Sequence, residues 1–229
     1  MWTSAAGTRG VRSLAKPGSE EVPPAAPTGK ILEAGFFNRE TVSVARDLLG
    51  KVLVREVDGR RLWGRMVEVE AYLGPDDLAS HSSGGRRSPR NEVMYGGPGH
   101  AYVYFTYGMH HCLNFVTRPA GMPQAVLIRA LEPGPGVGRC AGPGLVCRAF
   151  DIDRALNGVP LAPPHLYVVD DRAPKRRVVA TPRIGIFNSG DWQERPLRFC
   201  WDSPHLSRPI PKKDSPLPIG ERARVRGGK

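Results

Sequence analysis

A short stretch of the chain brings together side chains that could carry out acid–base chemistry. Glu68, Glu70 and Tyr72 alternate with apolar residues, and His81 follows after a Gly-Pro turn. Side chains at positions i and i+2 of a strand share a face, so we expect an apolar face packed inward and a reactive face turned outward. A carboxylate beside aromatic groups could act as a general base toward water. The spacing does not decide between the two glutamates, and a solvated sheet face without catalytic function is the competing interpretation.

Several common catalytic motifs are absent from the sequence. It has no Gly-x-x-x-x-Gly-Lys-Ser/Thr loop, no Gly-x-Ser-x-Gly elbow, no His-Glu-x-x-His pair and no nucleobase-deaminase motif. The 4 cysteines form no Cys-x-x-Cys pair, and no histidine stands at zinc-finger spacing from them, so we expect no metal site. Carboxylate chemistry is what remains.

Length and composition predict one domain with a basic surface. A chain of 229 residues that is 40% hydrophobic can bury one good core. Its net charge of +11 suits a polyanionic partner, although a solvated basic surface explains the charge equally well. No apolar run approaches the roughly 20 residues that span a bilayer, so we expect no membrane association and reduced, intracellular cysteines.

The composition changes at both ends of the chain. Residues 1–29 are rich in Ala, Pro, Gly and Ser, which predicts a disordered N-terminal tail. Their first 18 positions hold no acid and weakly resemble a transit peptide, but a plain tail fits better. Residues 210–229 are rich in Pro, Lys and Arg and predict a basic disordered tail. Residues 30–209 should therefore form the single domain.

Between the tails, local patterns predict a helix and two hairpins. The helix should begin at Asn38 as N-cap and end at Gly50. Asp58-Gly59 joins the strand-like runs 52–57 and 61–71 and is typical of a type I′ turn. The runs 101–106 and 110–116 should form the second hairpin, with Tyr107-Gly108-Met109 at its tip. Further strand-like runs cover residues 126–131, 166–169, 177–186 and 197–201, and one or two helical turns are expected at 145–150.

Two other segments hold candidate binding residues. Residues 82–100 form an irregular loop, from which Arg86, Arg87 and Arg90 could reach phosphates, or could simply be solvated. Arg129 interrupts an apolar strand and would need an anionic or polar partner there. The Gly-Pro cluster at residues 134–139 superficially resembles a helix-hairpin-helix turn, but a strand precedes it.

Five motifs occur in one order along the chain: Val67–Asp77 with His81, Arg90-Asn91, Tyr102–Met109 with Asn114, Leu127–Pro133 and Gly142-Pro143. Together they resemble the alkyladenine (3-methyladenine) DNA glycosylase family, from about residue 31 to residue 208. The resemblance implies an α+β fold, with a curved antiparallel sheet, surrounding helices and a protruding β-hairpin.

The resemblance also implies a base-excision repair enzyme that acts on double-stranded DNA. Such an enzyme flips a damaged purine out of the duplex (3-methyladenine, 7-methylguanine, hypoxanthine or ethenoadenine) and hydrolyses its N-glycosidic bond. No lysine occurs in the matched active-site motifs, so we expect an abasic product without strand cleavage. No metal or organic cofactor is implied. We expect a monomer associated with DNA inside the cell, in the bacterial cytoplasm or nucleoid, or in a eukaryotic nucleus.

By the same resemblance, Glu70 is the general base and Arg129 helps hold the site. Tyr72 and His81 on one side and Tyr104 on the other would sandwich the flipped base.

Four further residues receive roles in the same way. Asn114 would exclude normal guanine and Leu127 would line the pocket. Tyr107 would fill the space left by the flipped base, and Met109 would wedge the minor groove.

The sequence departs from the family in two places. Residues 134–141 replace a longer helical insertion, and Cys200 stands where an aromatic residue is usual. The first departure leaves open an alternative function, that of a catalytically impaired member that binds lesions or nucleic acid. A general nucleic-acid-binding module that uses charge and stacked aromatic residues is a further alternative.

Overall fold

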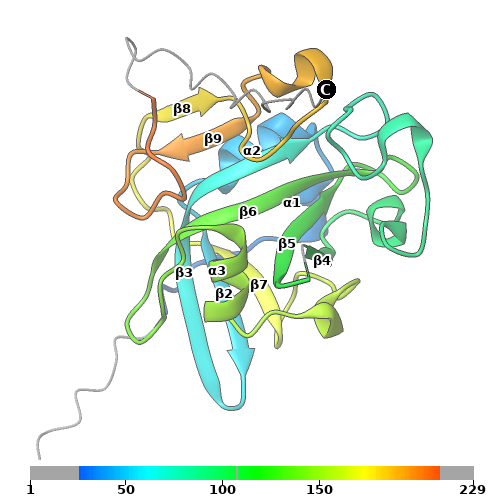
Figure 1. Cartoon of the computed structure of the whole chain (residues 1–229). Coiled ribbons are helices and arrows are strands. Elements are labelled where there is room, and N and C mark those ends of the chain that lie inside the picture. The colour runs from blue at the N-terminus through cyan, green and yellow to red at the C-terminus, as the bar shows by residue number, and fades with distance from the viewer. Residues whose placement is uncertain (1–25, 107, 212–229) are drawn as a thin grey trace, which may run out of the picture.

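The computed structural model describes residues 26–106 and 108–211, and the fold is α+β, as the sequence predicts. Within these residues, nine strands form one open antiparallel sheet, and only short helices accompany it (Figure 1). The strands are β1 (Lys30–Ile31), β2 (Val52–Val57), β3 (Arg60–Tyr72), β4 (Ala101–Thr106), β5 (His110–Thr117), β6 (Gln124–Pro133), β7 (Leu166–Asp170), β8 (Val178–Thr181) and β9 (Arg198–Trp201). The helices are α1 (Ala34–Phe37), α2 (Thr41–Leu48) and α3 (Pro143–Ala149), with 3-10 turns at Ser83–Gly85, Glu92–Tyr95, Arg154–Leu156 and Gly190–Gln193.

Strand β3 is the centre of the sheet. The main path runs β1-β7-β2-β3-β6-β5-β4, and β9 pairs with the second half of β3 beyond the end of β2. The register against β6 shifts on both sides of Glu68, which marks a β-bulge there. Both edges of β3 are therefore paired where Glu68 and Glu70 lie.

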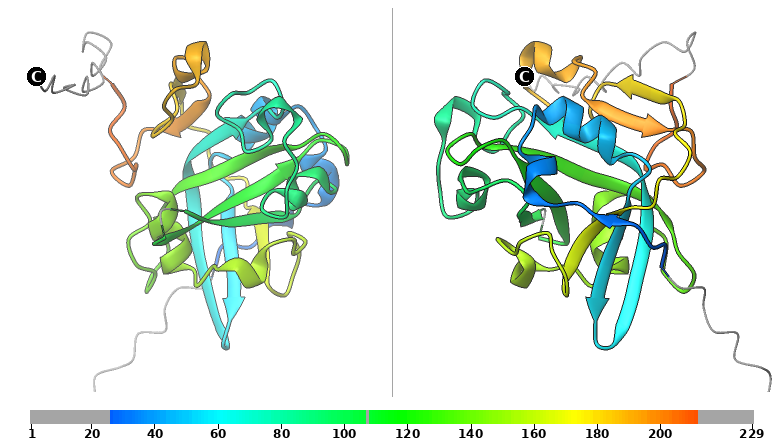
Figure 2. Two further views of the ribbon diagram at one scale, coloured as in Figure 1. Left: turned by 45° about the vertical axis from the view of Figure 1, so that its right-hand side comes forward. Right: turned by 180° about the vertical axis from the view of Figure 1, so that it is seen from behind.

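The two predicted hairpins are confirmed. β2 and β3 meet at Asp58 and Gly59, whose φ angles of 48° and 70° are both positive, as a type I′ turn requires. β4 and β5 form the second hairpin, with Gly108 and Met109 in its turn. Tyr107 lies outside the described residues. In Figure 2 the β2–β3 hairpin extends beyond the rest of the sheet.

The predicted start of the first helix is wrong. Asn38 is instead the C-cap of α1, a short helix that the sequence did not predict. The side chain of Phe37 has no exposed surface and anchors this helix. The N-cap of α2 is Glu40, whose carboxylate accepts hydrogen bonds from the backbone N–H groups of Val42 and Ser43. An acidic side chain can satisfy these free N–H groups as well as asparagine can.

The hydrophobic core lies between the sheet and the helices. Figure 2 shows α1 and α2 across the back of the sheet, where Val44 and Leu48 pack in one buried cluster with Val67 and Val69. The inward direction of this apolar face of β3 is as expected. No helix in the described part of the chain is both long and apolar enough to cross a membrane.

The other face of β3 is not turned outward, contrary to the prediction. Glu68 and Glu70 have no exposed surface, because two later segments of the chain fold back over them. One is the stretch after β8, residues 182–187. Strand β8 itself ends at Thr181 and not at residue 186 as predicted. Pro182 follows Thr181 and has no N–H to donate to a strand ladder. The other segment, residues 203–208, is called the C-terminal strap below.

Three smaller findings complete the comparison with the expected elements. The irregular loop at residues 82–100 contains two 3-10 turns. Residues 134–142 form a turn that returns to β6, where Ala141 bridges Ala130 and the Leu131 N–H donates to the Cys140 carbonyl. A strand thus precedes this turn, which excludes a helix-hairpin-helix. The predicted tails lie mostly outside the described residues and stay predictions.

Candidate active site

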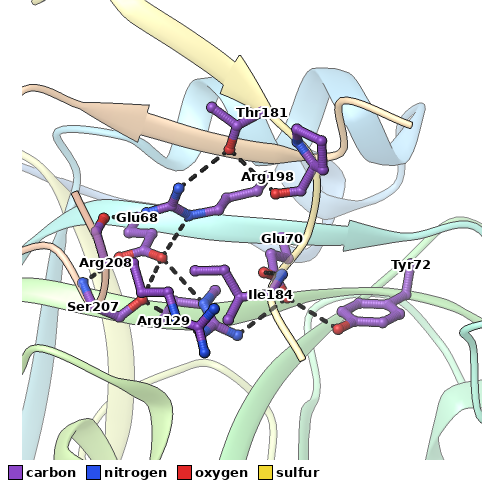
Figure 3. Close-up of polar contacts among 10 residues, drawn as sticks. Glu68, Glu70, Tyr72, Arg129, Thr181, Ile184, Arg198, Ser207 and Arg208 are labelled. Carbon is purple, nitrogen blue, oxygen red and sulfur yellow. Dashed lines mark hydrogen bonds and ion pairs between the residues drawn. The ribbon is translucent and has the colours of Figure 1, made fainter. Parts of the chain in front are cut away.

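Strands β3 and β6 bring two carboxylates and one guanidinium together under the sheet surface. Arg129 Nε donates to Glu68 Oε1 at 3.1 Å, and Arg129 Nη1 donates to Glu70 Oε2 at 3.3 Å (Figure 3). The two glutamates are fully buried, and Arg129 is 7% exposed. Buried charges are stable only when they are paired and hydrogen-bonded. The anionic partner expected for Arg129 is therefore the pair of glutamates on β3.

Three donors fix the carboxylate of Glu70. Besides Arg129, the Tyr72 hydroxyl donates to Oε2 at 3.0 Å, and the backbone N–H of Ile184 donates to Oε1 at 2.7 Å (Figure 3). An ionised carboxylate offers about four acceptor positions. One position, on Oε1, is therefore left for a further donor.

The three residues that donate to Glu70 also line a cavity of about 520 Å³, a volume within the range of small-molecule sites. Six of the residues proposed from the sequence line it: Tyr72, His81, Tyr104, Asn114, Leu127 and Arg129. Other parts of its wall come from Gly142–Leu145 at the start of α3 and from Ile184–Ile186. Residues 134–141, which the sequence predicts to be shorter than in the family, thus lead into the cavity wall.

The aromatic residues are grouped differently from the prediction. The ring of His81 lies against that of Tyr104, with centroids 4.5 Å apart, so these two share one side. His81 Nδ1 and the Tyr102 hydroxyl are 2.7 Å apart and hydrogen-bonded. Tyr72 is instead covered by the guanidinium of Arg183, 4.6 Å from its ring centre. The grouping expected from the family resemblance therefore does not hold for His81, which the intervening loop places against Tyr104.

Three ring side chains of the cavity wall, His81, Tyr72 and Tyr104, are uncharged near neutral pH. The pKa of His81 is lowered from 6.5 to about 4, first by burial and then by the charges of the nearby Arg90 and Arg86. Burial raises the pKa of both Tyr72 and Tyr104 well above 10, with neighbouring groups such as the Glu70 carboxylate adding to the shift. The cavity therefore presents neutral imidazole and phenol rings, which suit stacking against a flat ligand.

Asn114 and Leu127 face each other across β5 and β6. They are register partners, and both line the cavity. The Asn114 side-chain amide donates to the backbone carbonyl of Tyr102 at 3.1 Å, which fixes its orientation.

Sequence reasoning missed Arg183 and its partner Asp77. Arg183 donates through Nη1 to the Ala71 carbonyl at 2.9 Å, and through Nη1 and Nη2 to the two oxygens of Asp77 at 2.5 and 2.7 Å. Both side chains are completely buried. The signal was available, because Arg183 stands in an apolar stretch just as Arg129 does.

The roles of Ile184, Arg198 and Ser207 were also missed. Ile184 and Ser207 act partly through backbone N–H groups, which side-chain patterns do not reveal. Arg198 lies beside β3 only because β9 pairs with it.

The residues proposed for DNA contact lie around the outside. Met109 is 69% exposed in its turn. Arg86, Arg87 and Arg90 are all exposed, and Arg90 lies 5.3 Å from the centre of the Tyr104 ring. Arg87 is already paired with Glu92, at 2.5 Å.

Known proteins resemble this chain over most of its length. The profile of the family described as Methylpurine-DNA glycosylase (MPG) matches residues 35–204. A protein of Desulfitobacterium hafniense is 46% identical over 200 residues, which cover 78% of this chain and 98% of that protein. Proteins of Anaeromyxobacter dehalogenans (49% over 183 residues; 79% and 87% covered) and Methanocella arvoryzae (47% over 197; 79% and 98%) are similarly related. Each of the three is named "Putative 3-methyladenine DNA glycosylase".

The matched range contains Glu70, Arg129 and every side chain proposed for the aromatic walls. The resemblance that rests on five motifs thus extends over residues 35–204, which is most of the described fold. The chain belongs to the methylpurine-DNA glycosylase family and is a DNA-repair hydrolase of the DNA glycosylase type.

Proposed function

We propose that this protein removes alkylated or deaminated purines from duplex DNA by hydrolysis of the N-glycosidic bond, with Glu70 as general base. The candidate substrates are 3-methyladenine, 7-methylguanine, hypoxanthine and ethenoadenine. The observation that carries the proposal is a carboxylate whose three donors all come from the wall of a cavity that also holds neutral aromatic rings. A nucleotide must leave the base stack to reach such a cavity.

The walls suit a damaged purine. Tyr72 would stack on one face of the base, and His81 and Tyr104 on the other, where an electron-poor alkylated ring stacks well on neutral aromatic faces. The fixed amide of Asn114 would select against the 2-amino group of guanine, and Leu127 would complete the pocket. Tyr107 and Met109 would hold the duplex open, and Arg86, Arg87 and Arg90 would contact the phosphates.

Glu70 would act through the acceptor position that remains on Oε1. A water bound there would lose a proton to the carboxylate as it attacks C1′. Glu70 has no exposed surface in the free protein, so the Tyr72 hydroxyl or the segment Ile184–Ile186 must shift to admit this water. Arg129 would stay paired with the carboxylate and limit its movement. Because the matched motifs hold no lysine, the product would be an intact strand with an abasic site.

The test is base release from duplexes that carry one hypoxanthine or one ethenoadenine. After incubation, alkali cleaves the strand at abasic sites, and a sample without alkali reports any lyase activity. We expect cleavage only after alkali with the wild type, none with Glu70→Gln, and normal release by Glu56→Gln, a control on β2. Glu70→Gln should still bind the lesion duplex.

The results also separate the alternatives. Lesion binding without base release by the wild type would indicate a binding protein and refute the enzymatic proposal. Release by Glu70→Gln at the wild-type rate would refute the choice of base. Strand cleavage before alkali would refute the monofunctional reaction. Sedimentation with and without DNA tests the expected monomer.

A further inference from the structure

Glu68 is the centre of a buried network behind Glu70. Its Oε1 accepts hydrogen bonds from Arg129 Nε at 3.1 Å, Arg198 Nε at 2.8 Å and the Ser207 hydroxyl at 2.5 Å. Its Oε2 accepts from the Ser207 backbone N–H at 2.6 Å. Figure 3 shows the two guanidinium groups and the strap converging on this carboxylate.

Four donors hold the carboxylate of Glu68, three on Oε1 and one on Oε2. Of the residues that supply them, only Arg129 lines the cavity. Burial alone would raise the pKa of Glu68, but the charge of Arg198 and the hydrogen bonds from Arg198 and Ser207 outweigh it and keep the pKa below its ordinary value. Neither glutamate lines the cavity itself, but all three residues that donate to Glu70 do. Glu68 is thus a fixed anion whose partners, apart from Arg129, lie outside the cavity wall.

The network determines how Arg129 is presented to Glu70. Its Nε is held by Glu68, its Nη1 donates to Glu70, and its Nη2 lies 3.4 Å from the Ser207 hydroxyl. A planar guanidinium that is held at two of its three nitrogen atoms has little freedom to rotate, so the position of the third nitrogen is also determined. The orientation of Arg129 therefore depends on Glu68 and on the strap.

Arg198 ties the strap to the sheet. It donates to the Arg208 carbonyl at 2.6 Å and to the Thr181 hydroxyl at 3.2 Å, while its Nε holds Glu68 (Figure 3). One side chain thus connects β8, β9 and the strap. The family match ends at residue 204, so Ser207 and Arg208 lie beyond the region that the family profile covers.

We propose that Glu68 and Ser207 are positioning residues for the Arg129–Glu70 pair, and that the C-terminal strap completes the active site. The inference rests on the proposed function. Loss of either residue would let Arg129 turn and Glu70 move relative to the bound water. The chemical step would then slow, while the aromatic cavity that binds the base would stay intact.

The test measures single-turnover base release with excess enzyme on an ethenoadenine duplex, together with the Kd for the same duplex. We expect Glu68→Gln to release base about 100-fold more slowly, because a misplaced reacting group costs about this much. Ser207→Ala should be about 10-fold slower, the value of one hydrogen bond to a charged group. Ser207→Thr, which keeps the hydroxyl, should restore the rate. The Kd should change less than about twofold in each case, because no base contact is lost.

Arg65→Gln is the matched control on the same strand. Arg65 makes a two-point pair with Asp171 at 3.0 and 2.7 Å, remote from the cavity. This variant should lose stability without losing rate. If Glu68→Gln does not fold, the comparison of Ser207→Ala with Ser207→Thr decides.

Other outcomes would overturn the inference. Wild-type rates in folded Glu68→Gln and Ser207→Ala, or failure of Ser207→Thr to restore the rate, would refute the positioning role and leave the proposed function standing. A wild type that releases no base would refute both.

Discussion

Asp77→Asn measures what the buried pair of Asp77 and Arg183 contributes to the site. The carboxylate accepts four hydrogen bonds: two from Arg183 and one each from the backbone N–H groups of Leu73 and Ala79, both at 3.0 Å. Asparagine keeps one of the two oxygens and places an NH₂ group against donors that it cannot satisfy. It also leaves the Arg183 charge buried without a counterion.

The expected cost is large because both side chains have no exposed surface. Removing one partner of a buried ion pair costs about 3–5 kcal/mol, which lowers Tm by on the order of 10 °C in a chain of this size. The matched control is Asp47→Asn. Its partner is Arg39 at 2.9 Å, but the side chains are 44% and 38% exposed, so the loss should stay below about 1 kcal/mol.

Urea unfolding curves for the three proteins give the free energies. We also expect Asp77→Asn to weaken lesion binding, because Arg183 would no longer be held against the ring of Tyr72. Equal losses in Asp77→Asn and Asp47→Asn would refute the view that this pair stabilises the turn beside the cavity. A large loss of stability with unchanged Kd would refute its effect on the aromatic wall.

Three further predictions concern pH, packing and DNA contact. His81 has a pKa of about 4 in the folded protein, below its ordinary 6.5. Its contribution to stability is therefore complete above pH 6.5 and falls by about 3 kcal/mol as the pH drops toward 4. Unfolding curves of wild type and His81→Asn across this pH range test the prediction. Gly50→Ala should lower the free energy of unfolding by about 3 kcal/mol or more, because φ is +85° and the new Cβ would lie 2.1 Å from the ring of Trp201. Gly59→Ala, which has open space around the new Cβ, should lower it by only about 1 kcal/mol. Arg90→Ala should weaken DNA binding and reduce the salt dependence of log Kd by about one unit; an unchanged slope would exclude a phosphate contact.

The sequence predicted those parts of the fold that depend on local chemistry. The turn at Asp58-Gly59 follows from positive φ angles that few residues adopt, and the alternation in β3 correctly separates the core face from the carboxylate face. The start of α2 was wrong because several capping residues stand close together, and tertiary packing of Phe37 decides between them.

What the sequence did not predict depends on contacts between distant segments. Alternation places two carboxylates on one face of β3 but does not show that residues 182–187 and 203–208 will cover it. The contact of His81 with Tyr104 depends on the path of a loop, and the cover of Tyr72 depends on Arg183, more than 100 positions away. Each of these contacts joins segments far apart in the chain, where periodicity carries no information.

The choice between Glu68 and Glu70 shows the same division. Spacing makes them equivalent, and only the family resemblance separated them at first. The surroundings of the two carboxylates now give a physical reason. All three donors to Glu70 come from residues that line the cavity, whereas of the donors to Glu68 only Arg129 does. A general base must lie within hydrogen-bond reach of the water that it activates, and Glu70 keeps an acceptor position among groups of the cavity wall. The placement of the donors therefore favours Glu70 as the base and Glu68 as the residue that holds it in place.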